Sequence, residues 1–334
     1  MTDARSLSIA LQSNKPLTDY APLAVLVEDL GFDMLSIYAD LLFQPPVVPL
    51  ALAAQATDRI ALGPAAINPF TLHPVEMAGQ IATLDLLSEG RAYLGLVRGA
   101  WLEDIGVRQG DAVVMLREAI DVVERLLAGD DAGYHGRYVQ LKPGQRLRYD
   151  VQRPRIPLML GGWGPRVLAL AGERADEVKV GGSSNPDVVA SMRERIAVGA
   201  QRVERDPASI GVALGAVTVV DEDGHRARDL IRREMALYLP VVAPLDPTVA
   251  VDPELAARID ALVAAGDPAG AGRLIPDDLL DRFAFAGTPT QVIEQCEAIF
   301  AAGATRIEFG TPHGITAEGG IRLLGERVLP ALRR

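Results

Sequence analysis

Short apolar runs alternate with amphipathic segments from one end of the chain to the other. The first run, residues 7–11 (LSIAL), precedes a helical pattern over 22–30 that ends at Gly31. The alternation predicts eight strands, each followed by a helix, which begin at residues 7, 34, 60, 92, 156, 178, 212 and 306. Eight such units with short connections predict an α/β fold, a closed parallel (β/α)8 or TIM barrel. An open doubly wound sheet is the alternative.

Two segments interrupt this rhythm. Residues 133–147 (GYHGRYVQLKPGQRL) have the pattern of a hairpin-like excursion after the fourth unit. Residues 240–283 contain six prolines and a short helical pattern, and they are too long for a simple barrel loop. We therefore expect one barrel domain over residues 1–334, with an ordered insertion around 240–283 near the barrel mouth.

Charge and cysteine content narrow the classes of partner. The chain has 33 Lys plus Arg against 44 Asp plus Glu, a formal charge of −11, which argues against binding nucleic acid or an anionic membrane through the global field. The single Cys296 excludes an intramolecular disulfide and a multi-cysteine metal site. No apolar stretch approaches the roughly 18 residues of a membrane span, and we expect a cytoplasmic protein.

The predicted strand ends indicate a cofactor enzyme. In a barrel of this type the active site lies at the carboxyl ends of the strands. Those positions are poor in His and Cys, and they show neither metal-ligand spacing nor a Ser–His–Asp set. We therefore expect no metal and a cofactor that carries the difficult chemistry.

Glycine-rich loops follow the fifth and sixth predicted strands. They are GGWGP at 161–165 and GGSSNP at 181–186, and each opens a helix. Glycine lets backbone amides approach a ligand closely, and a helix N-terminus favours an anion. The two loops together favour a phosphate site, and the alternative is that glycine only makes tight βα turns.

The run IALGPAAINPFTLHPVEMAGQIATLDLLSEGRAYLGL, at 60–96, closely resembles the luciferase-like superfamily. The C-terminal stretch, from RLIPDD at 273–278 to VLP at 328–330, resembles the branch that contains methylenetetrahydromethanopterin reductase. Four features differ from that branch: no His follows Asp40, Ala10 stands in place of an acidic residue, Trp163 replaces a Gln, and residues 98–104 (RGAWLED) replace a small, glycine-rich loop.

This resemblance implies a barrel, usually dimeric, that binds coenzyme F420 or, alternatively, FMN at its mouth. It implies a non-prolyl cis peptide at Ala65–Ala66, which would back the deazaflavin ring. The implied cofactor-binding residues are Asp40, Ala65, Ala66, Asn68, Gly161, Gly162, Gly164, Gly181, Gly182 and Ser183.

The expected activity is hydride transfer between reduced F420 and a small organic substrate with a C=C, C=N or C=O bond. Asp40 and Glu103 are the candidate proton donors. The alternative to a catalytic role is a helix N-cap or a solvated loop carboxylate for Asp40, and an acid at the start of a helix for Glu103. Arg98, Trp101 and Trp163 are the candidate substrate-binding residues. The competing functions are an FMN-dependent monooxygenase and a barrel that binds a ligand without turnover.

Overall fold

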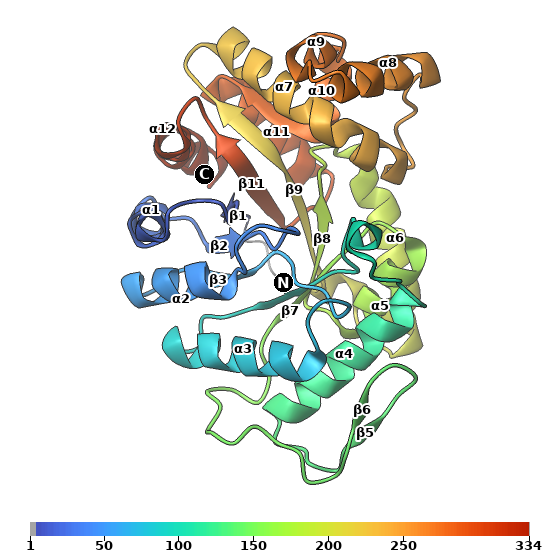
Figure 1. The fold of residues 1–334 in the computed structure, drawn as a ribbon. Coiled ribbons are helices and arrows are strands. Elements are labelled where there is room, and N and C mark those ends of the chain that lie inside the picture. The colour runs from blue at the N-terminus through green and yellow to red at the C-terminus, as the bar shows by residue number, and fades with distance from the viewer. Residues whose placement is uncertain (1–4, 334) are drawn as a thin grey trace.

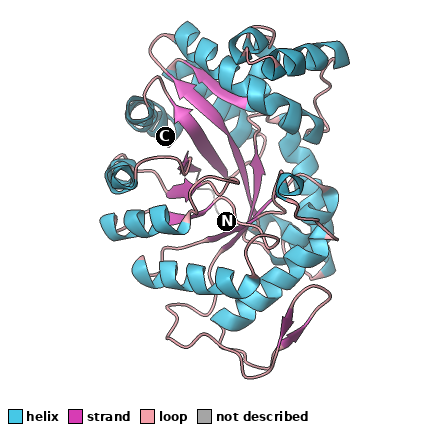
Figure 2. Ribbon diagram, viewed as in Figure 1, coloured by secondary structure: helices cyan, strands magenta, loops and turns pink. Residues whose placement is uncertain are grey.

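The computed structural model describes residues 5–333 and confirms the predicted parallel barrel surrounded by helices (Figures 1 and 2). The strands run around the barrel in the order β3-β2-β1-β11-β9-β8-β7-β4. They are β1 (Ser6–Leu11), β2 (Met34–Ile37), β3 (Ala61–Pro64), β4 (Leu94–Leu96), β7 (Leu158–Gly161), β8 (Glu177–Gly181), β9 (Gly211–Val220) and β11 (Arg306–His313).

The barrel closes between β3 and β4 through an irregular contact. Two parallel bridges join these strands, one between Leu62 and Ala92 and one between Ile67 and Leu96. The β3 side has one more residue than the β4 side between the two bridges, which makes a bulge. The Ala65–Ala66 peptide lies in this bulge.

Two glycines permit that closure. A Cβ on Gly63 would lie 2.2 Å from the carbonyl oxygen of Tyr93, and one on Gly95 would lie 2.0 Å from that of Pro64. Both distances are far below van der Waals contact, so the two backbones approach closely only because neither residue has a side chain.

The helices follow the predicted pattern with small shifts at their ends. The first helix begins at Leu17 rather than at Pro22, because Pro16 in an extended conformation ends the preceding loop and Pro22 is accommodated inside the helix. The helices are α1 (Leu17–Asp29), α2 (Val47–Ala56), α3 (Pro74–Leu87), η1 (Leu102–Ile105), α4 (Ala112–Leu127), α5 (Pro165–Arg174), α6 (Asp187–Arg202), η2 (Pro207–Ser209), α7 (Gly224–Val242), η3 (Ala243–Leu245), α8 (Pro253–Ala264), α9 (Pro268–Gly272), α10 (Asp277–Phe283), α11 (Pro289–Ala301), α12 (Ala317–Leu323), the π-helical η4 (Leu324–Val328) and α13 (Leu329–Leu332). No helix in the described range 5–333 combines the length and the apolar character needed to cross a bilayer.

Two smaller β elements lie outside the eight barrel strands. The excursion at 133–147 contains the antiparallel hairpin β5 (Tyr134–His135) and β6 (Gln140–Leu141), which projects beyond α4 in Figure 1. The strand β10 (Ala284–Gly287) was not predicted. It pairs in parallel with the second half of the long β9, on the edge that β8 leaves free. Its four residues are too short a run to stand out at the end of the 240–283 segment.

The segment after α7 contacts the loop that follows β8. Residues 243–283 fold as η3, α8, α9 and α10, and α8–α10 lie along α7 (Figure 1). The amide nitrogen of the Asn185 side chain donates to Asp246 Oδ2 (2.9 Å) and to Thr248 Oγ1 (2.8 Å). A Cβ on Gly182 would also lie 2.6 Å from Val242, the last residue of α7. This segment therefore fixes one of the two glycine-rich loops.

Candidate active site

The barrel interior contains a buried cluster of four charges, contributed by alternate residues of β8 and β11. Lys179 Nζ forms an ion pair with Glu308. Arg306 forms ion pairs with Glu177 (2.5 Å) and with Glu308 (3.0 Å). The two positive and two negative charges sum to zero, so the cluster is neutral as a whole. Glu308 is fully buried and the Arg306 side chain is almost so.

Glu308 stays ionised inside this cluster. Burial alone would raise its pKa, but the adjacent charges of Lys179 and Arg306 outweigh that effect and hold the pKa of Glu308 well below its usual range. The Ser36 hydroxyl donates a further hydrogen bond to Glu308 Oε2 (2.6 Å). The Ser36 oxygen is also 2.7 Å from the hydroxyl of Tyr93, so the network reaches the closing strands.

Tyr38 directly follows β2, at the end of this network that is nearest the barrel mouth. The Lys179 ammonium is 5.2 Å from the centroid of the Tyr38 ring. Burial and, after it, the charge of Glu308 raise the pKa of Tyr38, which keeps its hydroxyl protonated at neutral pH. Lys179, Glu308 and Tyr38 are not among the predicted site residues, because they lie within the predicted strands and the site was predicted beyond the strand ends.

Asp40 is exposed at the mouth and is held in place by Gln12, the residue that follows β1. Gln12 Nε2 donates to Asp40 Oδ2 at 2.8 Å. Burial and then the charge of Asp40 raise the pKa of Tyr238, which comes from α7. The structure therefore brings the candidate proton donor together with Gln12, which follows β1, and with Tyr238 of α7.

The other candidate acid and two candidate substrate residues lie on the loop after β4. Trp101 is exposed and has a positive φ of 55°, and Glu103 is exposed in η1. Arg98 forms no ion pair with Asp104 within residues 5–333. Gln109 Nε2 fixes the start of the loop by donating to the carbonyl of Arg98 at 3.0 Å. No hydrogen bond joins Glu103 to Asp40 in the described chain.

The bulge after β3 has the predicted backbone. The Ala65–Ala66 peptide is cis, which confirms the expectation from the resemblance. Asn68 is buried, and its Oδ1 accepts hydrogen bonds from the amides of Phe70 (3.1 Å) and Thr71 (3.0 Å). Asn68 thereby fixes the loop that leads into α3.

The two glycine-rich loops are joined by Trp163, whose Nε1 donates to the carbonyl of Gly181 at 3.1 Å. Gly161 ends β7, and Gly162 donates its amide to the carbonyl of Lys179 (3.1 Å). A Cβ on Gly164 or on Gly181 would meet no atom of residues 5–333 within 4 Å. These two glycines therefore face open space, and the others are packed.

Free amide donors are concentrated in the first loop. In the part of the chain that the structure describes, the amides of Trp163, Gly164, Arg166 and Val167 donate to no acceptor. They surround the N-terminus of α5, where a helix favours an anion. The first loop can therefore bind an anion through its backbone.

The second loop has its amides engaged within the protein. Gly182 and Ser183 both donate to the carbonyl of Gly215, at 2.7 and 3.1 Å. Gly182 also has a φ of 79°, which favours glycine for a conformational reason. These residues give the loop its shape and leave anion binding to the first loop.

Metal ligands do not gather at the mouth: among residues 5–333, no three His, Cys, Asp or Glu side chains are placed to hold a metal ion together.

Comparison with known proteins agrees with this architecture over the whole chain. The family model described as luciferase-like monooxygenase matches residues 3–306. The 5,10-methylenetetrahydromethanopterin reductase of Methanopyrus kandleri is 31% identical over 96% of each chain. The structure of the coenzyme F420-dependent tetrahydromethanopterin reductase from that organism superposes with a TM-score of 0.91 at 30% identity, and covers 98% of this chain and 99% of the other. An F420-dependent glucose-6-phosphate dehydrogenase of Microbacterium testaceum is 24% identical over 93% of this chain and 92% of its own length. The chain therefore belongs to the luciferase-like monooxygenase family.

Proposed function

We propose that this chain is an oxidoreductase that uses coenzyme F420 to transfer hydride to or from a small organic substrate. The observation that carries the proposal is the full-length similarity, at 31% identity, to a reductase whose structural counterpart is described as F420-dependent. The substrate would present a C=C, C=N or C=O bond.

The residues at the mouth fit this cofactor. The free amides around Gly164, at the N-terminus of α5, would hold its phosphate. The bulge at Ala65–Ala66, fixed by Asn68, would back its ring. Gly161, Gly162, Gly181, Gly182 and Ser183 would shape the two loops around it, and Asp40 would approach the ring from β2. When bound, F420 supplies or accepts a hydride at C5 of its deazaflavin ring.

The polar residues at the mouth would then position the substrate and move a proton. Asp40, held by Gln12, is the proposed proton donor, and Glu103 is the second candidate. Trp101 and Trp163 would provide apolar walls for the substrate, and Arg98 would pair with an acidic group on it. All of these residues follow strand ends.

The direct test is titration of the purified protein with F420 and, separately, with FMN, followed by fluorescence and absorbance. We expect saturable F420 binding and weak FMN binding. The opposite preference would favour an FMN-dependent monooxygenase. Binding of neither would contradict the redox function and favour a barrel that binds another ligand without turnover.

Gly164→Ala tests the proposed phosphate site. The added methyl meets no atom of the described chain within 4 Å, and Gly164 has a φ of −70° that alanine adopts readily. We therefore expect little change in thermal stability. We expect the Kd for F420 to rise about tenfold, because the methyl occupies space beside the free amides. The matched control is Gly182→Ala, which should lower the unfolding midpoint through its positive φ and its contact with Val242. Unchanged F420 affinity in Gly164→Ala would contradict phosphate binding at this loop.

Asp40→Asn tests the proposed proton donor. Asparagine keeps an oxygen for the Gln12 hydrogen bond but cannot donate a carboxylic proton, so we expect kcat to fall about 100-fold with little change in F420 affinity. The pH profile of kcat should also lose one limb. Glu103→Gln is the control: if it has the larger effect on kcat, Glu103 is the donor instead.

We also propose a homodimer in the cytoplasm, which the resemblance to a usually dimeric family implies. Sedimentation velocity should then give one species of about twice the 35.6 kDa chain mass. A monomer at micromolar concentration would contradict the dimer, and recovery outside the soluble cytoplasmic fraction would contradict the location.

A further inference from the structure

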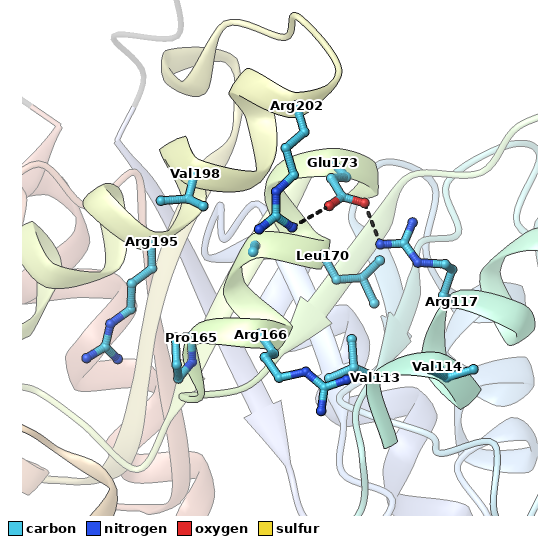
Figure 3. Close-up of a pocket in the computed structure, with 11 residues that line it drawn as sticks. Val113, Val114, Arg117, Pro165, Arg166, Leu170, Glu173, Arg195, Val198 and Arg202 are labelled. Carbon is cyan, nitrogen blue, oxygen red and sulfur yellow. Dashed lines mark hydrogen bonds and ion pairs between the residues drawn. The ribbon is translucent and has the colours of Figure 1, made fainter. Parts of the chain in front are cut away.

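A cavity of about 440 Å³ lies on the outside of the barrel, between α4, α5 and α6 (Figure 3). Four arginines line it: Arg117 of α4, Arg166 of α5, and Arg195 and Arg202 of α6. Glu173 of α5 lies between Arg117 and Arg202 in Figure 3. We call these five residues and the cavity the arginine groove.

Glu173 assembles the groove. Its carboxylate accepts hydrogen bonds from Arg117 (2.5 Å) and Arg202 (3.0 Å), and its side chain is only 8% exposed. Burial would raise the pKa of Glu173, but the two arginines outweigh it and lower the pKa, so the group is ionised at neutral pH. A buried anion thus draws together two guanidinium groups from different helices.

The groove keeps a surplus of positive charge. Arg166 pairs with Asp111 at 2.8 Å, so four arginines face two carboxylates in a chain of net charge −11. The side chains of Arg117 and Arg202 are 41% and 59% exposed. Each guanidinium has five N–H donors and uses only some of them here, so the groove can accept further carboxylates. Bracing of three helices alone would not require this open, cationic volume.

The groove begins at the proposed phosphate loop. Arg166 is the second residue of α5, and its own amide is one of the free donors. Arg195 donates to the carbonyl of Trp163 at 3.1 Å. From Arg166 the groove follows α5 to Glu173, a distance of about 10 Å along the helix at 1.5 Å per residue. An anionic chain that leaves the phosphate loop here would pass directly over the arginines.

We propose that the arginine groove binds the carboxylates of the oligoglutamate chain that F420 carries beyond its phosphate. This inference rests on the proposed function, since it requires F420 at the mouth. Paired guanidinium–carboxylate contacts would give affinity that depends on the length of the chain and on ionic strength.

The test compares two probes by fluorescence titration at low salt: F420 with several glutamates, and a form that ends at the phosphate-linked lactate. We expect wild-type protein to bind the glutamate-bearing form about tenfold more tightly, and added salt to reduce the difference. In the variant Arg117→Gln/Arg202→Gln we expect the two Kd values to converge, with the Kd of the shorter form unchanged. Arg322→Gln is the matched control, because Arg322 is an equally exposed helix arginine in an ion pair on α12.

Glu173→Gln separates ligand binding from bracing of the helices. The glutamine oxygen can still accept a hydrogen bond from Arg117 or Arg202 and so keep the groove assembled, but the negative charge that competes with the ligand is gone. The glutamate-bearing form should therefore bind as tightly as to wild type or more tightly. Weaker binding of that form to Glu173→Gln would overturn the proposal, as would equal wild-type affinity for the two probes. Failure of both probes to bind wild-type protein would instead contradict the proposed function.

Discussion

Glu308→Gln is expected to destabilise the fold by about 3–5 kcal/mol, the cost of removing one partner from a buried ion pair. The glutamine leaves the Lys179 ammonium, whose side chain is 8% exposed, without its acidic partner. It also gives the neutral cluster a net positive charge in the barrel interior. Urea-induced unfolding of the wild type and the variant at pH 7 measures the difference in free energy of unfolding.

The matched control is the double variant Lys179→Met/Glu308→Gln. Removing both partners restores neutrality, because Arg306 keeps its ion pair with Glu177. We therefore expect the double variant to be more stable than the sum of the single effects implies, with a coupling energy of about 1–3 kcal/mol. Additive effects, or a cost below about 1 kcal/mol for Glu308→Gln, would contradict a buried, mutually dependent ion pair.

The barrel could be predicted because its signal is local. Strands of a parallel sheet covered on both faces are short apolar runs, and the helices between them show their own period. The strand β10 lacked this signal: Ala284–Gly287 is short, and it is defined by pairing with β9, about 70 residues earlier in the chain. Closure between β3 and β4 also depends on distant backbone contacts at Gly63 and Gly95, which no local pattern reveals.

The charged cluster did have a sequence signal. In EVKVG (β8) and RIEFG (β11), charged residues alternate with apolar ones within strands that are otherwise buried. With period two, Glu177 and Lys179 share one face, as do Arg306 and Glu308. Opposite charges on the same face of two such strands predict an ion-pair layer inside the barrel.

Which of the two glycine-rich loops has free amide donors could not be predicted from sequence. Both loops have glycines before a helix, and both were assigned to phosphate. The amides of Gly182 and Ser183 are engaged by Gly215, and Val242 packs on Gly182. These partners lie about 30 and 60 residues further along the chain, so only the tertiary structure shows that the free donors belong to the first loop.

We expect the free energy of unfolding to fall by about 2–3 kcal/mol between pH 7 and pH 4.5 because of His313. The residue is fully buried at the end of β11, and its Nε2 is 3.2 Å from the carbonyl oxygen of Phe309. Its Nδ1 has no hydrogen-bond partner within residues 5–333. Burial first, and then the charge of Lys15, lower the pKa of His313 to about 4 from 6.5. Urea unfolding at the two pH values measures the loss.

The direction follows from the protonated ring being the charged form. Between pH 6.5 and pH 4 the unfolded chain binds a proton on this ring and the folded chain does not, so stability is full above pH 6.5 and falls as the pH is lowered. His313→Asn cannot titrate there, and asparagine tolerates the positive φ of 76° at this position. Its loss of stability on acidification should be smaller than that of wild type by about 2 kcal/mol. The matched control is His135→Asn, because His135 in β5 is exposed in the folded chain. This variant should lose as much free energy of unfolding on acidification as the wild type. If His313→Asn loses as much free energy of unfolding on acidification as the wild type, groups other than His313 cause the acid sensitivity.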